Sequence, residues 1–157
     1  MLAVPQRRRP VSSYRTVSLL VEVCAVLAVR IPSYTAEVFS GALGYDLPTP
    51  LVPGPTCVGR VEEVAADVFQ LRVGEVVLCN SYLSPGDIAG ASDDILIGWT
   101  GNRTARSARM QQRWRRGSFA KKALYPASCL TPLRDADPIG DVGRMPFLAS
   151  LAIADGG

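Results

Sequence analysis

Apolar residues occur in short runs along this chain, and proline or glycine separates most of the runs. Short runs rich in β-branched residues indicate strands rather than helices. We expect a buried pair of adjoining strands at residues 17–29, and single strands at 58–64, 76–79 and 119–125. The sequence therefore predicts a mainly β fold with small helices.

Two segments carry helix signals. Residues 104–116 contain no proline or glycine and mix apolar side chains with arginine and glutamine, and Gly117 follows as a stop signal. A shorter helical turn is expected near residue 35, where Ser33 or Thr35 could cap it and Gly41 could close it. Both helices are too short to change the predicted fold class.

Length and composition describe one globular domain. A chain of 157 residues buries one core, and 48% hydrophobic with 20% charged residues is far from the composition of disorder. We divide the chain into a flexible N-terminus (1–16), a folded domain (17–140) and a C-terminal connection (141–157) with an apolar run at 146–154. Arginines in residues 1–16 suit a mitochondrial transit peptide, but prolines interrupt its helix, so we expect a cytoplasmic protein and keep a mitochondrial one as the alternative.

The charge pattern gives little support for a nucleic-acid or membrane partner. The net charge of +3 is small, and its excess lies in residues 7–9 and 103–116. The segment 103–116 could form a nucleic-acid or acidic-membrane patch, or a surface helix that docks Met110 and Trp114 onto the domain. We favour docking, and we expect neither nucleic acid nor membrane as a partner. The apolar run at 17–29 is also too short to span a bilayer.

Cysteine spacing predicts thiols with structural roles. The four cysteines at positions 24, 57, 79 and 129 form no C-x-x-C pair, and the chain contains no histidine. We therefore expect no metal site, because four isolated cysteines would have to converge to form one. Cys57 could be a reactive thiol, but no basic neighbour is visible in the sequence, so we expect it to be structural.

Several short motifs follow one another in a specific order. They are V-P-G at 52–54, V-G-R-V at 58–61, L-R-V-G-E-V-V at 71–77 and G-S-F-A at 117–120, with I-G-W at 97–99 before the last. In this order they resemble the N-terminal, GroES-like half of zinc-type alcohol dehydrogenases in the medium-chain dehydrogenase/reductase family. The I-G-W segment is similar to fungal-type members of that family.

This resemblance implies a GroES-like, partly open β-barrel and an NAD(P)-dependent oxidoreductase activity in the complete protein. Members of the family bind the dinucleotide in a second, Rossmann-type domain, and we expect that domain to be missing from this chain. No G-x-G-x-x-G stands between a strand and a helix. We therefore expect the chain alone to bind no cofactor, and residues 141–157 to begin the connection to a missing cofactor domain.

The chain departs from the family pattern at the metal site. Zinc-dependent members carry histidine and glutamate directly after V-P-G, where this chain has Pro55 and Thr56. A further cysteine ligand would fall within residues 31–34, and none is there. The resemblance thus implies zinc-independent chemistry, with Tyr34 as the one candidate catalytic donor or acid. The alternative for Tyr34 is a partly buried side chain bonded to the backbone.

Two functions remain open from the sequence. The first is the substrate-side domain of a zinc-independent NAD(P)-dependent oxidoreductase, which we expect to be inactive alone. The second is a truncated or degenerate, non-catalytic barrel that binds a partner or a second copy. With no cofactor domain to cover it, an apolar face with Ala149, Leu151 and Ile153 would be left uncovered or satisfied by self-association.

Overall fold

The computed structural model describes residues 21–66, 68–85, 93–101, 104–134 and 144. The helices are α1 (Thr35–Phe39) and α2 (Ala105–Arg113), with a 3-10 turn η1 (Ala127–Cys129). The strands are β1 (Val21–Val29), β2 (Cys57–Glu63), β3 (Val76–Cys79), β4 (Tyr82–Leu83), β5 (Ile95–Leu96), β6 (Lys122–Pro126) and β7 (Leu130–Pro132). The predicted mainly β class with small helices is confirmed.

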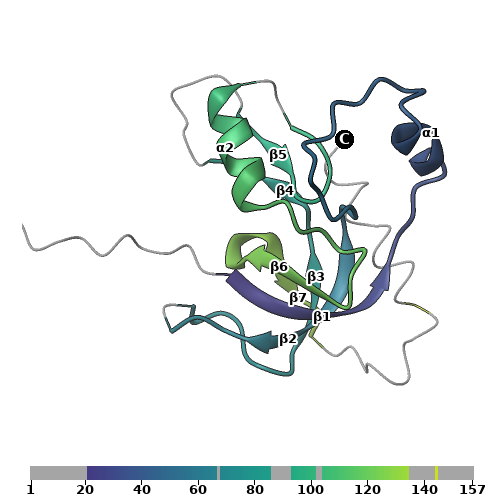
Figure 1. Ribbon diagram of the computed structural model, residues 1–157. Coiled ribbons are helices and arrows are strands. Elements are labelled where there is room, and N and C mark those ends of the chain that lie inside the picture. The colour runs from purple at the N-terminus through teal and green to yellow at the C-terminus, as the bar shows by residue number, and fades with distance from the viewer. Residues whose placement is uncertain (1–20, 67, 86–92, 102–103, 135–143, 145–157) are drawn as a thin grey trace, which may run out of the picture.

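The strands form one large and one small sheet (Figure 1). The large sheet has the order β6-β1-β2-β3-β7, and each neighbouring pair is antiparallel. The small sheet is the antiparallel pair β4-β5, beside which α2 lies. Both sheets are open, since β6 and β7 remain edge strands of the large sheet and do not pair with each other. This arrangement is a partly open GroES-like architecture.

Strand β1 lies inside the large sheet, because its backbone pairs with a neighbouring strand along both edges. It pairs with β2 along one edge and with β6 along the other, and two register shifts interrupt its pairing with β2. The expectation of two adjoining strands is wrong for residues 21–29, which form a single strand. Residues 17–20 lie outside the described part of the chain.

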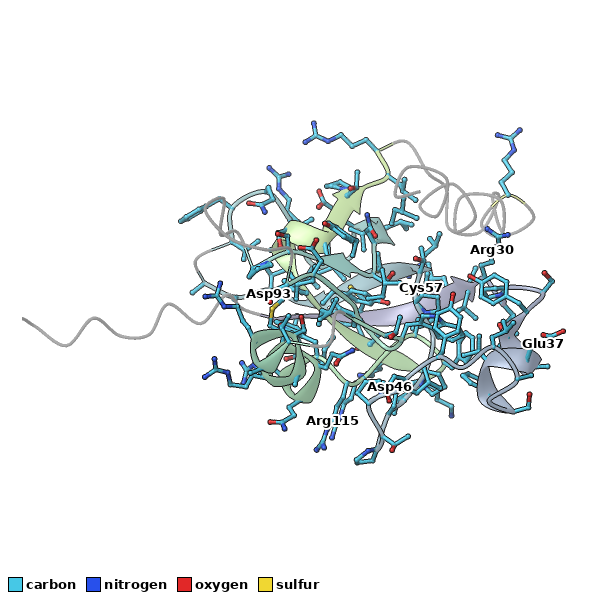
Figure 2. All side chains as sticks on the ribbon, turned by 90° about the horizontal axis from the view of Figure 1, so that it is seen from above. Arg30, Glu37, Asp46, Cys57, Asp93 and Arg115 are labelled. Atoms are coloured by element: carbon cyan, nitrogen blue, oxygen red, sulfur yellow. The ribbon has the colours of Figure 1, made fainter. Side chains whose placement is uncertain are left out.

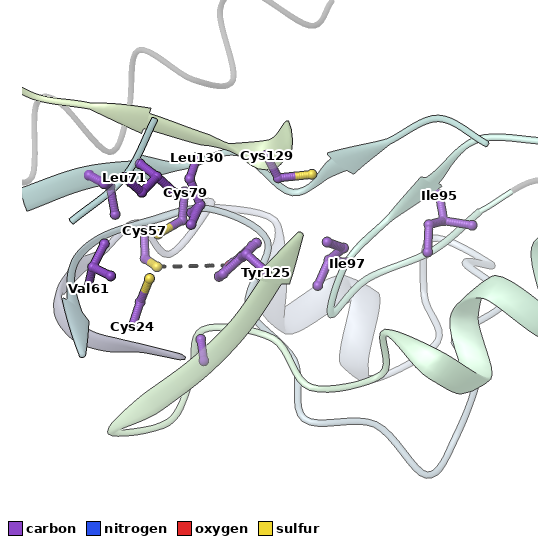
Figure 3. Packing of buried hydrophobic residues seen from close by; sticks show 12 residues of the cluster. Cys24, Cys57, Val61, Leu71, Cys79, Ile95, Ile97, Tyr125, Cys129 and Leu130 are labelled. Carbon is purple, nitrogen blue, oxygen red and sulfur yellow. Dashed lines mark hydrogen bonds between the residues drawn. The ribbon is translucent and has the colours of Figure 1, made fainter. Parts of the chain in front are cut away.

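A single main core fills the space between the sheets (Figure 3). Met110 and Trp114 are partly buried and pack from α2 against this core, so the docking interpretation of the basic segment is confirmed. The buried residues of the core are Cys24, Cys57, Val61, Leu71, Val77, Cys79, Ile95, Ile97, Ala123, Tyr125, Cys129 and Leu130.

Helix α1 begins differently from its prediction. Its N-cap residue is Tyr34, which makes no capping hydrogen bond through its side chain, so neither Ser33 nor Thr35 is the cap. The Thr35 hydroxyl instead donates back to the carbonyl oxygen of Pro32 over 2.7 Å. Gly41 does close the segment, with φ +80°.

Several other expectations fall on residues that the structure does not describe. These are the flexible N-terminus (1–16), the connection (141–157) apart from Arg144, and the apolar run with Ala149, Leu151 and Ile153. Strand β6 begins at Lys122 rather than at residue 119, because the backbone before it is engaged elsewhere.

Candidate functional site

Three backbone segments cross at Gly54, Gly98 and Gly117, which we call the glycine junction. A Cβ atom on Gly98 would lie 2.5 Å from the Cα of Gly117 and 2.7 Å from the carbonyl oxygen of Gly54. Gly54 and Gly98 also have positive φ angles of +115° and +68°. Only glycine combines this backbone conformation with so close an approach.

Backbone hydrogen bonds connect the three segments. The Gly54 N–H donates to the Gly98 carbonyl over 3.1 Å, and the Ser118 N–H donates to the Gly54 carbonyl over 2.9 Å. The Phe119 N–H donates to the Pro53 carbonyl over 2.9 Å. The V-P-G, I-G-W and G-S-F-A motifs, far apart in the sequence, are therefore one structural unit, and this contact keeps residue 119 out of β6.

The turn after the junction presents Pro55 and Thr56, both buried. The Pro55 carbonyl accepts a hydrogen bond from the Tyr125 hydroxyl over 3.1 Å. The Thr56 hydroxyl is 1% exposed and lies 3.5 Å from the Ser81 hydroxyl. A proline side chain and two neutral hydroxyls are not zinc ligands of the usual nitrogen, sulfur or carboxylate kind. Among the described residues, no three histidine, cysteine or acidic side chains are placed to hold a metal ion.

Three cysteine side chains meet in the core, which the sequence analysis missed. Cys57 and Cys79 face each other across β2 and β3. A Cβ atom on Gly59 would lie 3.0 Å from the Cβ of Cys24 and 3.4 Å from the Sγ of Cys79, so this glycine leaves the space in which the thiols meet. Only the pairing register of three strands could have revealed this cluster.

Hydrogen bonds within this thiol cluster shift the pKa values of Cys57 and Cys79 in opposite directions. The contact with Cys79 lowers the pKa of Cys57 despite burial, and Tyr125 acts in the same direction. The contacts with Cys24 and Cys57, together with burial, raise the pKa of Cys79 well above its usual range. Figure 3 shows the Cys57 sulfur directed toward Tyr125, 3.9 Å from its hydroxyl. All three thiols are 0% exposed, which supports a structural role for Cys57.

Tyr34, the candidate catalytic residue, lies at the start of α1 with 42% of its surface exposed. It is neither buried nor part of either of two surface hollows. One hollow of about 290 Å³ lies between residues 43–46 and 100–101. The other, of about 510 Å³, lies between Pro48–Pro50 and α2. Tyr34 is therefore an exposed side chain, whereas Thr56 and Ser81 are buried.

A sequence model of the alcohol dehydrogenase GroES-like domain matches residues 17–135. The chain belongs to this family. A solved structure of an NAD-dependent alcohol dehydrogenase is also similar, with a TM-score of 0.55 and 20% identity over 71% of this chain and 31% of that one. At this identity the likeness shows the fold alone, and the chain spans about a third of that enzyme's length. No curated protein matches the sequence.

The described residues contain no βαβ unit of the kind that binds a dinucleotide. A nucleotide-binding βαβ unit needs parallel strands joined by a helix, with a glycine-rich turn at the helix N-terminus. All named strand pairs of the described residues are antiparallel.

No helix in the described ranges is long and apolar enough to cross a membrane.

Proposed function

We propose that this chain is the substrate-side domain of a zinc-independent, NAD(P)-dependent oxidoreductase, and that it has no activity alone. The glycine junction carries the proposal, because it supports a turn with the V-P-G sequence of the family. Pro55 and Thr56 follow this turn at the positions where zinc-dependent members carry the histidine and glutamate. The Pro55 carbonyl is already engaged by Tyr125. The domain would therefore shape a substrate site without supplying a metal.

In such a protein, hydrogen-bond donors would polarise the substrate carbonyl or conjugated double bond. Tyr34 is our candidate donor, because its side chain is partly exposed. It also lies at the start of α1, in the turn that faces the cleft between the two domains in members of the family. The NAD(P) and its binding residues would come from a separate cofactor domain. That domain, or a second copy of this chain, is the proposed partner, and the cytoplasm the proposed compartment.

Titration of the purified chain with NADH and NADPH, followed by nicotinamide fluorescence, tests whether cofactor binding belongs to a separate domain. We expect no binding at cofactor concentrations up to about 100 μM, the middle of the usual range for enzyme substrates. Micromolar binding would overturn the proposal, because the proposal assigns NAD(P) binding to a separate cofactor domain.

The genomic sequence after the codon for Gly157 tests the role as one domain of an enzyme. A dinucleotide fingerprint within about 30 residues, the length of one βαβ unit, would support it. A natural protein of 16.8 kDa with no such sequence downstream would instead favour the non-catalytic barrel.

A further inference from the structure

The positive charge of this chain is concentrated in one acid-free segment. Residues 95–134 contain no aspartate or glutamate, while the rest of the chain has fourteen acidic and eight basic residues. The nine basic residues of the segment are Arg103, Arg106, Arg109, Arg113, Arg115, Arg116, Lys121, Lys122 and Arg134. The small net charge of +3 therefore hides a local excess of nine positive charges.

Helix α2 displays the centre of this charge on its surface. Arg106, Arg109 and Arg113 recur at intervals of three and four residues and so lie along one side of the helix. Arg115 and Arg116 follow directly, and all five side chains are exposed. We call these five residues the basic surface. Figure 2 shows the Arg115 side chain projecting away from the sheet.

One acidic side chain offsets part of this charge. Asp93 forms an ion pair with Arg106, whose Nε lies 3.4 Å from the Asp93 carboxylate. Lys122, farther along, pairs with Glu62 at 2.7 Å. Among the described residues, ion pairs thus engage one of the five arginines of the basic surface, which retains a substantial positive field.

The apolar side of α2 is already used. Met110 and Trp114 pack against the core, so they cannot insert into a lipid surface. The exposed residues of α2 are arginine, glutamine and alanine. A membrane-bound amphipathic helix needs large apolar side chains on its outward face, which α2 does not offer. Charge complementarity alone, without apolar insertion, suits a phosphate polymer better.

We propose that the basic surface binds the phosphate backbone of a nucleic acid without reading its sequence, a role beyond the proposed function. Arginine suits this partner because its planar fork bonds phosphate oxygens in pairs. Beside Arg115, Gln111 and Gln112 line the hollow of about 510 Å³, where a nucleotide could contact their amides. This proposal differs from the expectation of no nucleic-acid partner, which rested on the small net charge of the whole chain.

Fluorescence anisotropy with a labelled 20-nucleotide RNA, a duplex DNA and anionic vesicles tests the proposal. We expect both nucleic acids to bind, with the RNA affinity falling steeply with salt. Each phosphate contact adds about −0.7 to the slope of log affinity against log salt for a single strand. Removing two contacts with Arg109→Gln/Arg113→Gln should flatten the slope by about 1.4 and weaken binding roughly tenfold at low salt.

The matched control is Arg30→Gln/Arg72→Gln, which removes the same charge outside the segment. Figure 2 shows Arg30 at the end of the molecule away from α2. We expect this variant to keep the slope and most of the affinity, and circular dichroism to confirm that both variants fold. Equal losses in the two variants, no binding at low salt, or binding to vesicles alone would each overturn the proposal.

Discussion

Gly54 is a residue of the glycine junction at which both crowding and backbone conformation oppose a side chain. A Cβ atom there would lie 2.5 Å from the Phe119 nitrogen and 2.6 Å from the Ser118 hydroxyl oxygen, in addition to a φ of +115°. We expect Gly54→Ala to lower the free energy of unfolding by more than about 3 kcal/mol, because backbone atoms must move. Urea unfolding followed by tryptophan fluorescence measures this loss.

Gly74→Ala separates the effect of a positive φ from the effect of crowding around the added Cβ atom. Gly74 has a similarly positive φ of +93°, but nothing lies within 4 Å of a Cβ atom there. This variant should lose only about 1–2 kcal/mol, the cost of a left-handed conformation. Similar losses at both positions would show that the crowding at the junction is not what makes Gly54 necessary.

Cys129 makes stability sensitive to alkaline pH. Burial raises the pKa of its thiol from 9.0 to about 11. The unfolded chain therefore releases this proton first, so stability present below pH 9 is lost as pH rises toward 11. The loss amounts to about 2–3 kcal/mol. Cys79 and Tyr125, whose pKa values are also raised, act in the same direction, whereas Cys57 opposes them.

Urea unfolding between pH 8 and pH 11 measures this dependence. The Cys129→Ala variant should show a shallower decline than the natural chain, since one of the contributing thiols is gone. An unchanged decline would mean that Cys129 ionises alike in both states.

The sequence reveals the roles of some single residues and hides those of others. Replacement of the ligand positions by Pro55 and Thr56 is visible at once, because it is a local comparison with the family pattern. The space that Gly59 leaves for Cys24 and Cys79 is invisible, because it depends on strands β1 and β3 meeting across β2. The four cysteines look isolated for this reason.

Secondary-structure elements follow the same distinction. Strand β3 occupies the predicted residues 76–79, and α2 lies inside the predicted 104–116, because local apolar runs and the absence of proline decide both. Strand β7 was missed, since its three residues end in Pro132 and form a strand only by pairing with β3. Nonlocal pairing is what the sequence pattern lacks.

Thr104 stabilises the first turn of α2. Its hydroxyl oxygen accepts a hydrogen bond from the Ser107 N–H over 3.0 Å, so it satisfies a donor that the helix leaves unpaired. Thr104→Ala should lower the free energy of unfolding by about 1 kcal/mol, as usual for a lost N-cap. Chemical denaturation followed by far-ultraviolet circular dichroism measures this change.

Thr131→Ala provides the comparison for Thr104. Thr131 is an exposed residue of β7, so its replacement should change stability by less than about 0.5 kcal/mol. Equal effects at the two positions would argue against the cap as the cause.

On the scale of the whole molecule, residues 31–45 expose much apolar surface. Ile31 is 66% exposed and Leu43 is 50% exposed, and Tyr34, Phe39 and Tyr45 exceed 40%. Such side chains mark an interaction site when they gather on one part of a surface. We predict that the chain alone self-associates as its concentration rises, which sedimentation velocity measures.

The double variant Ile31→Ser/Leu43→Ser should shift this equilibrium toward monomer. Phe69→Ser is the control, because Phe69 is 88% exposed but lies outside this segment. A natural chain that stays monomeric at every concentration would contradict the prediction.

The glycine junction also determines where the chain can grow. Residues 55–97, with strands β2 to β5, and residues 99–116, with helix α2, are two segments whose ends are held at the same crossing. Doubling the length of a flexible loop between fixed ends costs only about 0.6 kcal/mol of closure entropy. Insertions in the exposed turns between the elements of either segment should therefore cost little stability, and descendants of such a domain could acquire new surface there without altering the crossing itself.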